Sequence, residues 1–137
     1  MPALANLHAT ALIVGGKGVI IFGAPGAGKT ALALELIRES LRDNIEAMLV
    51  SDDRVDLALT DGKLVASPPA QLAGLIEVRG SGIHEIGYVE SAALDLAVNL
   101  VDTQKAERIS PAEPQLIAHG VKLPALKLPI GYTGPQV

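Results

Sequence analysis

The chain has 137 residues, 49% of them hydrophobic, with a formal net charge of −4 and a pI near 5.3. An acidic chain with one Phe, two Tyr and no Trp offers neither a basic surface nor stacking platforms for nucleic acid. It has no cysteine, which excludes disulfides and thiolate chemistry, and no apolar run approaches the length of a membrane span. We therefore expect a cytoplasmic protein with a single domain over residues 1–137 and no nucleic-acid or membrane partner.

The first third of the sequence predicts a hairpin followed by a helix. Strands are expected over residues 9–14 and 19–22, joined by a glycine turn. A helix is expected over residues 31–42, because apolar residues recur there at helical spacing and should face the core. These core-facing residues are Leu34, Ile37 and Leu41. The opposite helix face, which we interpret as solvated, carries Glu35, Arg38, Glu39 and Arg42.

The rest of the sequence is rich in strand signals. The expected strands are residues 47–50, 55–60, 63–66 and 75–78, with residues 92–101 as a strand or a short helix. Asp61-Gly62 is a strong hairpin signal. The proline-rich segment of about residues 110–137 is expected to form loops and edge segments. One helix among six or seven strands predicts a strand-rich α/β domain, unlike a Ras-like GTPase or a nucleoside-monophosphate kinase.

The most specific motif is a glycine-rich loop between a predicted strand and a predicted helix. It matches G-x-x-x-x-G-K-[ST], the phosphate-binding P-loop, and consists of Gly23, Ala24, Pro25, Gly26, Ala27, Gly28, Lys29 and Thr30. Such a loop aims backbone N–H groups and a helix N-terminus at phosphate. Lys29 would reach the β- and γ-phosphates, and the Thr30 hydroxyl would bind Mg²⁺. The alternative is an ordinary glycine turn before an amphipathic helix.

Two adjacent acids follow a predicted buried strand. Asp52 and Asp53 stand where an acid commonly approaches the Mg²⁺ of a P-loop site. One would join the metal shell, and the other would accept a proton from an attacking hydroxyl. The alternative is a polar turn between strands.

A third acid, Glu77, lies on the same face of a predicted strand as Arg79. A carboxylate and a guanidinium on one face suit Mg²⁺ binding and neutralisation of phosphoryl charge, or else a structural ion pair. His8 precedes the first predicted strand, where a lone histidine is typically a surface or capping residue. The spacing of His8, His84 and His119 does not indicate a metal site.

Four separated pieces of the sequence resemble the catalytic domain of bacterial HPr kinase/phosphorylase. His8 stands 15 residues before Gly23, as in that family. Residues 30–36, Thr-Ala-Leu-Ala-Leu-Glu-Leu, resemble the family's Ser-Glu-Thr-Ala-Leu-Glu-Leu. Residues 51–55, Ser-Asp-Asp-Arg-Val, resemble its Ala-Asp-Asp-Arg-Val. Residues 77–83, Glu-Val-Arg-Gly-Ser-Gly-Ile, resemble its Glu-Ile-Arg-Gly-Leu-Gly-Ile.

The resemblance implies a fold and a reaction. The fold would be a single P-loop α/β domain related to phosphoenolpyruvate carboxykinase. The reaction would be ATP- and Mg²⁺-dependent phosphorylation of a serine on an HPr-type phosphocarrier protein of the phosphotransferase system. By position, Asp53 matches the proton acceptor and His8 the histidine beside it. Lys29 and the rest of the loop would hold the nucleotide. The residues expected in the metal shell are Thr30, Glu77 and Asp52.

The chain also departs from the family pattern. The family's Gly-Asp-Ser-Gly is Gly23-Ala24-Pro25-Gly26 here, and its C-terminal Pro-x-x-x-Gly-Arg-Asn segment, associated with dephosphorylation, is not recognisable. The resemblance therefore favours kinase over phosphorylase activity and a short, alphaproteobacterial-type form, and it leaves homo-oligomeric assembly open. Two other classes remain as alternatives, a nucleotide-binding regulatory module without transfer activity and a small-molecule P-loop kinase.

Overall fold

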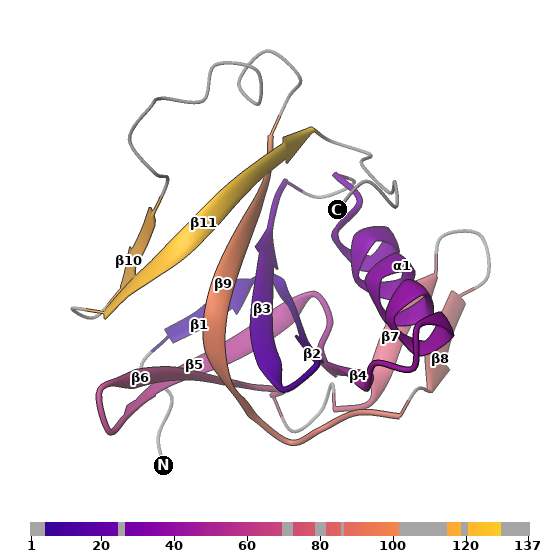
Figure 1. The fold of residues 1–137 in the computed structure, drawn as a ribbon, viewed down its shortest axis with the longest axis horizontal. Coiled ribbons are helices and arrows are strands. Elements are labelled where there is room, and N and C mark those ends of the chain that lie inside the picture. Colours follow the sequence, from indigo (N-terminus) through magenta and orange to yellow (C-terminus); the bar gives the residue numbers. More distant parts are fainter. Residues whose placement is uncertain are drawn as a thin grey trace.

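One strongly curved sheet and one helix make up most of the described chain (Figure 1). The computed structural model describes residues 5–24, 27–69, 73–78, 82–85, 87–101, 115–118 and 121–129. Its strands are β1 (Ala5–His8), β2 (Thr10–Val14), β3 (Lys17–Phe22), β4 (Ala47–Ser51), β5 (Arg54–Thr60), β6 (Lys63–Ser67), β7 (Leu75–Val78), β8 (Gly82–Glu85), β9 (Ala92–Val101), β10 (Gln115–Ala118) and β11 (Val121–Pro129). The helix is α1 (Lys29–Arg42).

The main sheet joins nine of the described strands. Its path runs β1-β5-β6-β9-β3-β2-β4, with β11 beside β9 and β10 beside β11, and β7 and β8 form a separate antiparallel hairpin. Only the β3–β9 and β9–β11 pairs among these described strands are parallel. Strand β9 therefore pairs with three neighbours, with β6 near its start and with β3 and β11 further along.

The hairpins predicted from turn residues are confirmed. Strand β2 pairs antiparallel with β3, and β5 pairs antiparallel with β6 across Asp61-Gly62. Asp61 has a φ of 50° and Gly62 a φ of 77°. Positive φ at both central residues defines the turn whose twist matches the flanking strands, and this explains the Asp-Gly pair. The segment 92–101, left open between strand and helix, is a strand.

Two strand pairs meet at a break in the antiparallel ladder. The β2–β4 ladder ends at Ala11 and Ser51, and the β1–β5 ladder begins again at His8 and Arg54. Across the gap, the Ala9 N–H donates to the carbonyl of Asp53 at 3.2 Å, and Asp53 has a φ of 69°. The register is the same on both sides of this gap, and the irregularity lies one step earlier, where Ala11 pairs with Ser51 and Leu12 with Leu49. Val50 is therefore an extra residue in β4, and such a bulge turns the neighbouring side chains in new directions.

The core has two parts. One lies against α1 and includes Leu12, Ile21, Leu32 and Val98, and the other lies inside the curve of the sheet. Ile37 packs against the core as expected, whereas Leu41 was also expected to face the core and is 55% exposed. The prediction was wrong for Leu41, because the most buried positions of the helix lie elsewhere on its surface. Its buried residues are Leu32, Ala33 and Ser40.

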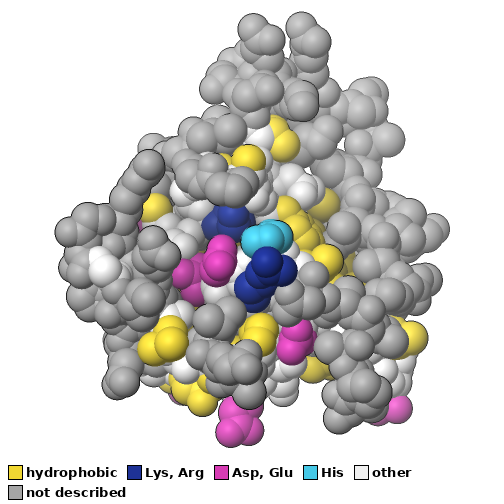
Figure 2. Space-filling model, turned by 180° about the vertical axis from the view of Figure 1, so that it is seen from behind, with side chains coloured by type: hydrophobic (Ala, Val, Ile, Leu, Met, Phe, Trp, Pro, Cys, Tyr) yellow, Lys and Arg dark blue, Asp and Glu magenta, His cyan; other side chains and the backbone are white. Residues whose placement is uncertain are grey.

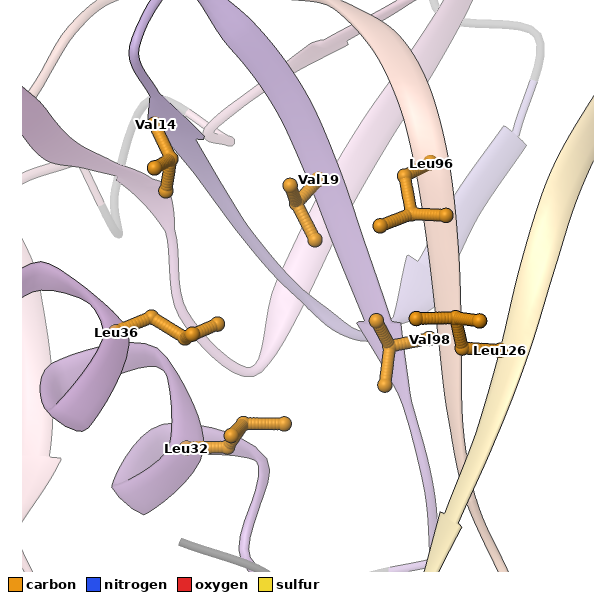
Figure 3. Close-up of a pocket in the computed structure, with 7 residues that line it drawn as sticks. All are labelled: Val14, Val19, Leu32, Leu36, Leu96, Val98 and Leu126. Atoms are coloured by element: carbon orange, nitrogen blue, oxygen red, sulfur yellow. The ribbon is translucent and has the colours of Figure 1, made fainter. Parts of the chain in front are cut away.

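An apolar cavity of about 120 Å³ lies between α1 and the sheet (Figure 3). Leu32 and Leu36 extend from the helix toward side chains of β3, β9 and β11. All its lining residues are apolar, so the cavity presents no group that could bind phosphate or move a proton. The lining consists of Val14, Val19, Leu32, Leu36, Leu96, Val98 and Leu126.

The C-terminal part contains more strand than the sequence suggested. Loops and edge segments were expected for residues 110–137, and the structure describes β10 and β11 within them. Strand β11 pairs with β9 over residues 125–129, while Pro124 lies in the part that pairs with β10. Strands β1 and β8 were not predicted either. Each is a four-residue strand, too short to give a clear alternation of its own.

Candidate functional site

The glycine-rich loop connects β3 to α1, as its motif requires. Gly28 is the N-cap of the helix with a φ of 103°, a conformation that a residue with a Cβ rarely adopts. Pro25 and Gly26 lie outside the described residues. The helix itself begins at Lys29, two residues earlier than the sequence indicated, so Lys29 and Thr30 belong to its first turn.

The N-terminus of α1 has no described side chain that would neutralise its positive dipole. No side chain caps it through a hydrogen bond among the described residues, and its first turn carries no acidic residue. The first N–H groups of a helix have no partners within the helix, and the helix dipole places partial positive charge there. This end of α1 is therefore suited to an anion.

The Lys29 ammonium lies over the glycine-rich loop. Its Nζ donates to the carbonyl oxygen of Gly23 at 2.9 Å and approaches that of Ala24 at 3.5 Å. Carbonyl oxygens orient the ammonium without cancelling its charge. The Lys29 side chain therefore places a positive charge beside the glycine-rich loop, at the N-terminal end of α1.

Asp52 follows the last residue of β4, and its side chain contacts the first turn of α1. It is only 5% exposed, and its Oδ1 accepts a hydrogen bond from the Thr30 hydroxyl at 2.7 Å. The same Oδ1 accepts a second bond from the Thr10 hydroxyl at 2.8 Å. The structure thus brings together two residues that the sequence assigned to one metal shell, Thr30 and Asp52.

The turn after β4 separates the two adjacent acids. Asp52 points into the protein, whereas Asp53 is exposed. The turn is closed by the Ser51 hydroxyl, which donates to the Arg54 carbonyl at 2.5 Å, and by the Arg54 N–H, which donates to the Asp52 carbonyl at 2.8 Å. The two adjacent acids therefore lie in different environments, and the separate roles predicted for them stay predictions.

His8 lies opposite this turn. It is the last residue of β1, it is exposed, and it pairs in register with Arg54. Figure 2 shows a histidine side chain beside basic and acidic side chains near the middle of one face of the molecule. The strand register places the backbone of His8 next to the turn that carries Asp53.

Glu77 cannot be placed in the same detail. The backbone of Glu77 lies in β7, opposite Ile83 of β8, while its side chain and the whole of Arg79 lie outside what the structure describes. Its proposed part in the metal shell stays a prediction. Within the described ranges, no three His, Cys, Asp or Glu side chains converge to hold a metal. The described helix is too short and too polar to cross a membrane.

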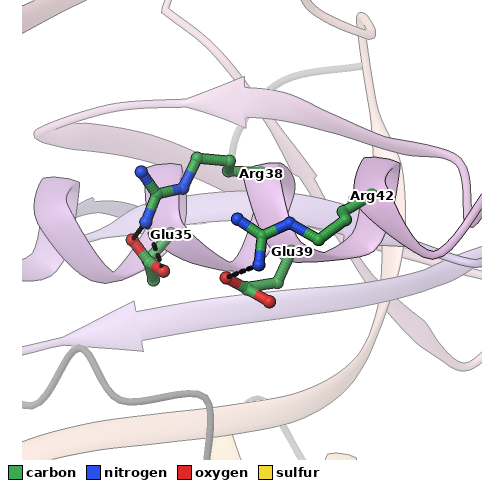
Figure 4. Close-up of polar contacts among 4 residues, drawn as sticks. All are labelled: Glu35, Arg38, Glu39 and Arg42. Atoms are coloured by element: carbon green, nitrogen blue, oxygen red, sulfur yellow. Dashed lines mark hydrogen bonds and ion pairs between the residues drawn. The ribbon is translucent and has the colours of Figure 1, made fainter.

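The outer face of α1 carries the charge pattern expected for a solvated helix (Figure 4). Arg38 contacts Glu35 at 2.6 Å, and Arg42 contacts Glu39 at 3.4 Å. The hydrogen bond from Arg38 lowers the pKa of Glu35, and the same contact raises the pKa of Arg38. The two partners of each pair are three residues apart, on neighbouring turns of the helix. Such surface pairs contribute little to stability.

Two residues of the site were missed by sequence reasoning. Thr10 was interpreted only as part of an apolar strand, and Ser51 only as the residue before the acids. Both are fully buried, and both use their hydroxyl groups to fix the turn that carries Asp52 and Asp53. A polar residue inside an apolar run was the available signal, because a buried hydroxyl needs a partner.

Comparison with known proteins identifies the family. Residues 2–135 match the family model of the HPr Serine kinase C-terminal domain. The HPr kinase/phosphorylase of Clostridium tetani is 41% identical over 93 residues, which cover 66% of this chain and 28% of that protein. That of Streptococcus equinus is 31% identical over 136 residues, which cover 91% of this chain and 42% of the relative.

The fold agrees with the sequence match. The solved Hpr(Ser) kinase/phosphatase of Coxiella burnetii superposes with a TM-score of 0.78 at 28% identity, covering 93% of this chain and 87% of that one. The chain spans less than half the length of the two curated relatives described above. A family match over nearly all residues, on a strand-rich α/β fold shared with a solved member, shows that this chain belongs to the HPr serine kinase C-terminal domain family.

Proposed function

We propose that this chain binds ATP with Mg²⁺ at the Gly23–Thr30 loop and transfers the γ-phosphoryl group to a serine of an HPr-type phosphocarrier protein. The observation that carries the proposal is the 2.7 Å hydrogen bond between the Thr30 hydroxyl and Asp52 Oδ1. It joins the helix end that suits an anion to an acid at the end of a strand. The relatives are named as kinases of HPr, which supports the choice of partner.

The nucleotide phosphates are assigned to the loop and the first turn of α1. Backbone N–H groups that lack partners within the helix would donate to phosphate oxygens. Lys29, whose ammonium already lies over the loop carbonyls, would move onto the β- and γ-phosphates and offset their charge. The first turn of α1 contains no acidic residue, so the positive charge of these groups is not cancelled by a residue of that turn.

The residues present fit a magnesium ion. Mg²⁺ prefers oxygen ligands and is commonly bound through one or two carboxylates together with substrate phosphates, so no three-residue cluster is required. Asp52 supplies a buried carboxylate and Thr30 a hydroxyl on the same side of the loop. Glu77 is proposed as a further ligand on the sequence pattern alone. When bound, the ion would neutralise charge on the phosphate oxygens.

Asp53 is proposed as the general base. It is exposed and accessible to a protein substrate, unlike its buried neighbour Asp52. Its carboxylate would take the proton from the serine hydroxyl as the serine oxygen bonds to the γ-phosphorus. The bond between that phosphorus and the β–γ bridging oxygen then breaks, and ADP leaves. His8, across the strand break, would help to orient the serine.

The test is transfer of radiolabelled phosphate from ATP to purified HPr-type protein. Asp53→Asn should bind ATP as the wild type does and lose about 10²–10⁴-fold in transfer rate, as expected for loss of a general base. Asp61→Asn is a matched control. Asp61 is also exposed and also has a positive φ, but it lies at a hairpin tip away from the loop. It should transfer phosphate at the wild-type rate.

Other outcomes would change the assignment. If Asp53→Asn transfers normally while Asp52→Asn is inactive, the two acids have exchanged roles. If wild-type protein binds ATP but phosphorylates no HPr-type protein, the regulatory-module alternative replaces the kinase. If label instead appears on a small metabolite, the chain is a small-molecule kinase.

A further inference from the structure

Thr10 is a fully buried polar residue with no part in the function proposed above. It is the first residue of β2, its exposed fraction is 0%, and its hydroxyl donates to Asp52 Oδ1 at 2.8 Å. The contact joins positions 42 residues apart in the chain. The other residues of β2 are Ala, Leu, Ile and Val, which have no polar side-chain group. Its hydroxyl therefore stands out chemically at this position.

Asp52 Oδ1 has two donors that differ in their setting. Thr30 lies in the first turn of α1, next to the glycine-rich loop, and its hydroxyl points to the same oxygen at 2.7 Å. Thr10 lies in the sheet and pairs with Ile21 of β3, so its backbone is fixed by the ladder. Thr30 is also a proposed metal ligand, whereas Thr10 is not, so of these two described donors Thr10 is the one whose hydroxyl contacts only the Asp52 carboxylate in the proposed site.

We propose that Thr10 is a positioning residue that orients the Asp52 carboxylate for Mg²⁺ in the nucleotide complex. This inference rests on the proposed function, because it assumes a metal between Thr30, Asp52 and the phosphates. Thr10 touches neither nucleotide nor metal in this scheme. It acts by fixing one oxygen of a buried carboxylate, as hydrogen-bond partners of metal ligands generally do.

A purely structural explanation makes a different prediction. Every buried side-chain polar atom in the described part of the chain has a hydrogen-bond partner, so the Thr10 contact could serve only to satisfy Asp52. In that case, removal of the hydroxyl would lower stability without changing how strongly metal promotes ATP binding. Ser51 offers the comparison, because its buried hydroxyl closes the same turn without contacting the Asp52 side chain in its described bond to Arg54.

Calorimetry of ATP binding, with Mg²⁺ and with a chelator, separates these explanations. Thr10→Val keeps the side-chain shape and removes the hydroxyl, Thr10→Ser keeps the hydroxyl, and Ser51→Ala is the control for loss of a buried hydroxyl. Thr10→Val should bind ATP like wild type in chelator. The Mg²⁺ concentration that gives half of the metal-dependent gain should rise by about 10- to 100-fold. Thr10→Ser and Ser51→Ala should keep the wild-type value.

Each other result has a defined meaning. A wild-type Mg²⁺ requirement in Thr10→Val overturns the positioning role while leaving the proposed function intact. The same rise in Ser51→Ala as in Thr10→Val would also overturn it, because the effect would then come from loosening of the turn. If Thr10→Val does not fold, a raised Mg²⁺ requirement in Thr10→Ser would overturn the positioning role, because that variant retains the hydroxyl. If wild-type protein shows no Mg²⁺-dependent ATP binding, the proposed function fails and this inference fails with it.

Discussion

The glycine-rich loop at the start of α1 and the outer face of α1 are two charged regions of the molecule. They differ in whether their charged side chains contact neutral groups or opposite charges. Near the loop, the described contacts of Lys29 and Asp52 are to neutral groups, carbonyl oxygens in one case and hydroxyls in the other. On the outer face, the carboxylates of Glu35 and Glu39 contact guanidinium groups (Figure 4).

The difference concerns what remains for a ligand. A neutral hydrogen-bond partner fixes the position of a charged group but leaves its net charge in place. An oppositely charged partner fixes the position and cancels the field. The loop region can therefore attract phosphate and a cation, whereas the outer face offers a ligand little net charge. Three substitutions test this comparison.

Removal of the loop cation should have the largest effect. Lys29→Ala should weaken ATP binding by at least about 30-fold, since truncation of a hydrogen-bonded charge commonly costs about 2–5 kcal/mol. Isothermal calorimetry measures this directly. Lys63→Ala, which removes an exposed lysine at the start of β6, is the matched control and should bind ATP like wild type. ATP binding that survives in Lys29→Ala would show that the loop region is no more important than the outer face.

Removal of the charge of Asp52, with its shape retained, should have an intermediate effect. Asp52→Asn keeps an oxygen that accepts from the Thr10 and Thr30 hydroxyls, so the melting temperature should stay within a few degrees of wild type. The Mg²⁺-dependent gain in ATP affinity should fall at least about tenfold, because magnesium prefers a carboxylate. A full gain in Asp52→Asn would mean that geometry, and not charge, matters at this position.

Neutralisation of Glu35 should have the smallest effect. The pKa of Glu35 is lowered by Arg38, so any stability from the pair is present above the unfolded-state pKa and is lost as the pH falls through the lower folded-state value. Glu35→Gln should melt close to wild type at neutral pH and low salt. Any difference should disappear in acid, and also in high salt, which screens surface pairs. A large loss of stability at neutral pH would mean that the outer face is more than a solvated surface.

Much of the fold was readable from local patterns. Strand β7, the helix and both predicted hairpins carry their own signals, such as Asp61-Gly62. What could not be read depends on partners far away in the chain. Leu41 has the sequence spacing of a core-facing helix residue, yet it is 55% exposed, whereas Leu32 of the same helix is 1% exposed. Which helix positions are buried depends on where the sheet packs. Strand β11 pairs with β9, and no local sequence pattern predicts this pairing.

The candidate site shows the same division. The loop motif and the resemblance pointed to His8, Lys29, Thr30, Asp52 and Asp53, and the family they implied is confirmed. The catalytic, nucleotide and metal roles of these residues remain predictions. Thr10 was not identified, although a polar residue in an apolar run was a weak signal, because its partner lies 42 residues away and threonine is common in strands. Physical neighbours of a motif are found only when the chain is folded.

The central position of β9 has a consequence for the order in which the molecule forms. Gly18 of β3 pairs with Leu94, and Val65 of β6 pairs with Ala93, so neither strand meets this neighbour until β9 has been synthesised. Closing such long loops carries an entropic cost, and folds dominated by distant pairings form slowly. Until β9 arrives, β3 and β6 present open edges to other nascent chains, and open edges promote aggregation. The strand that leads into the loop therefore completes its pairing only after β9 has been synthesised.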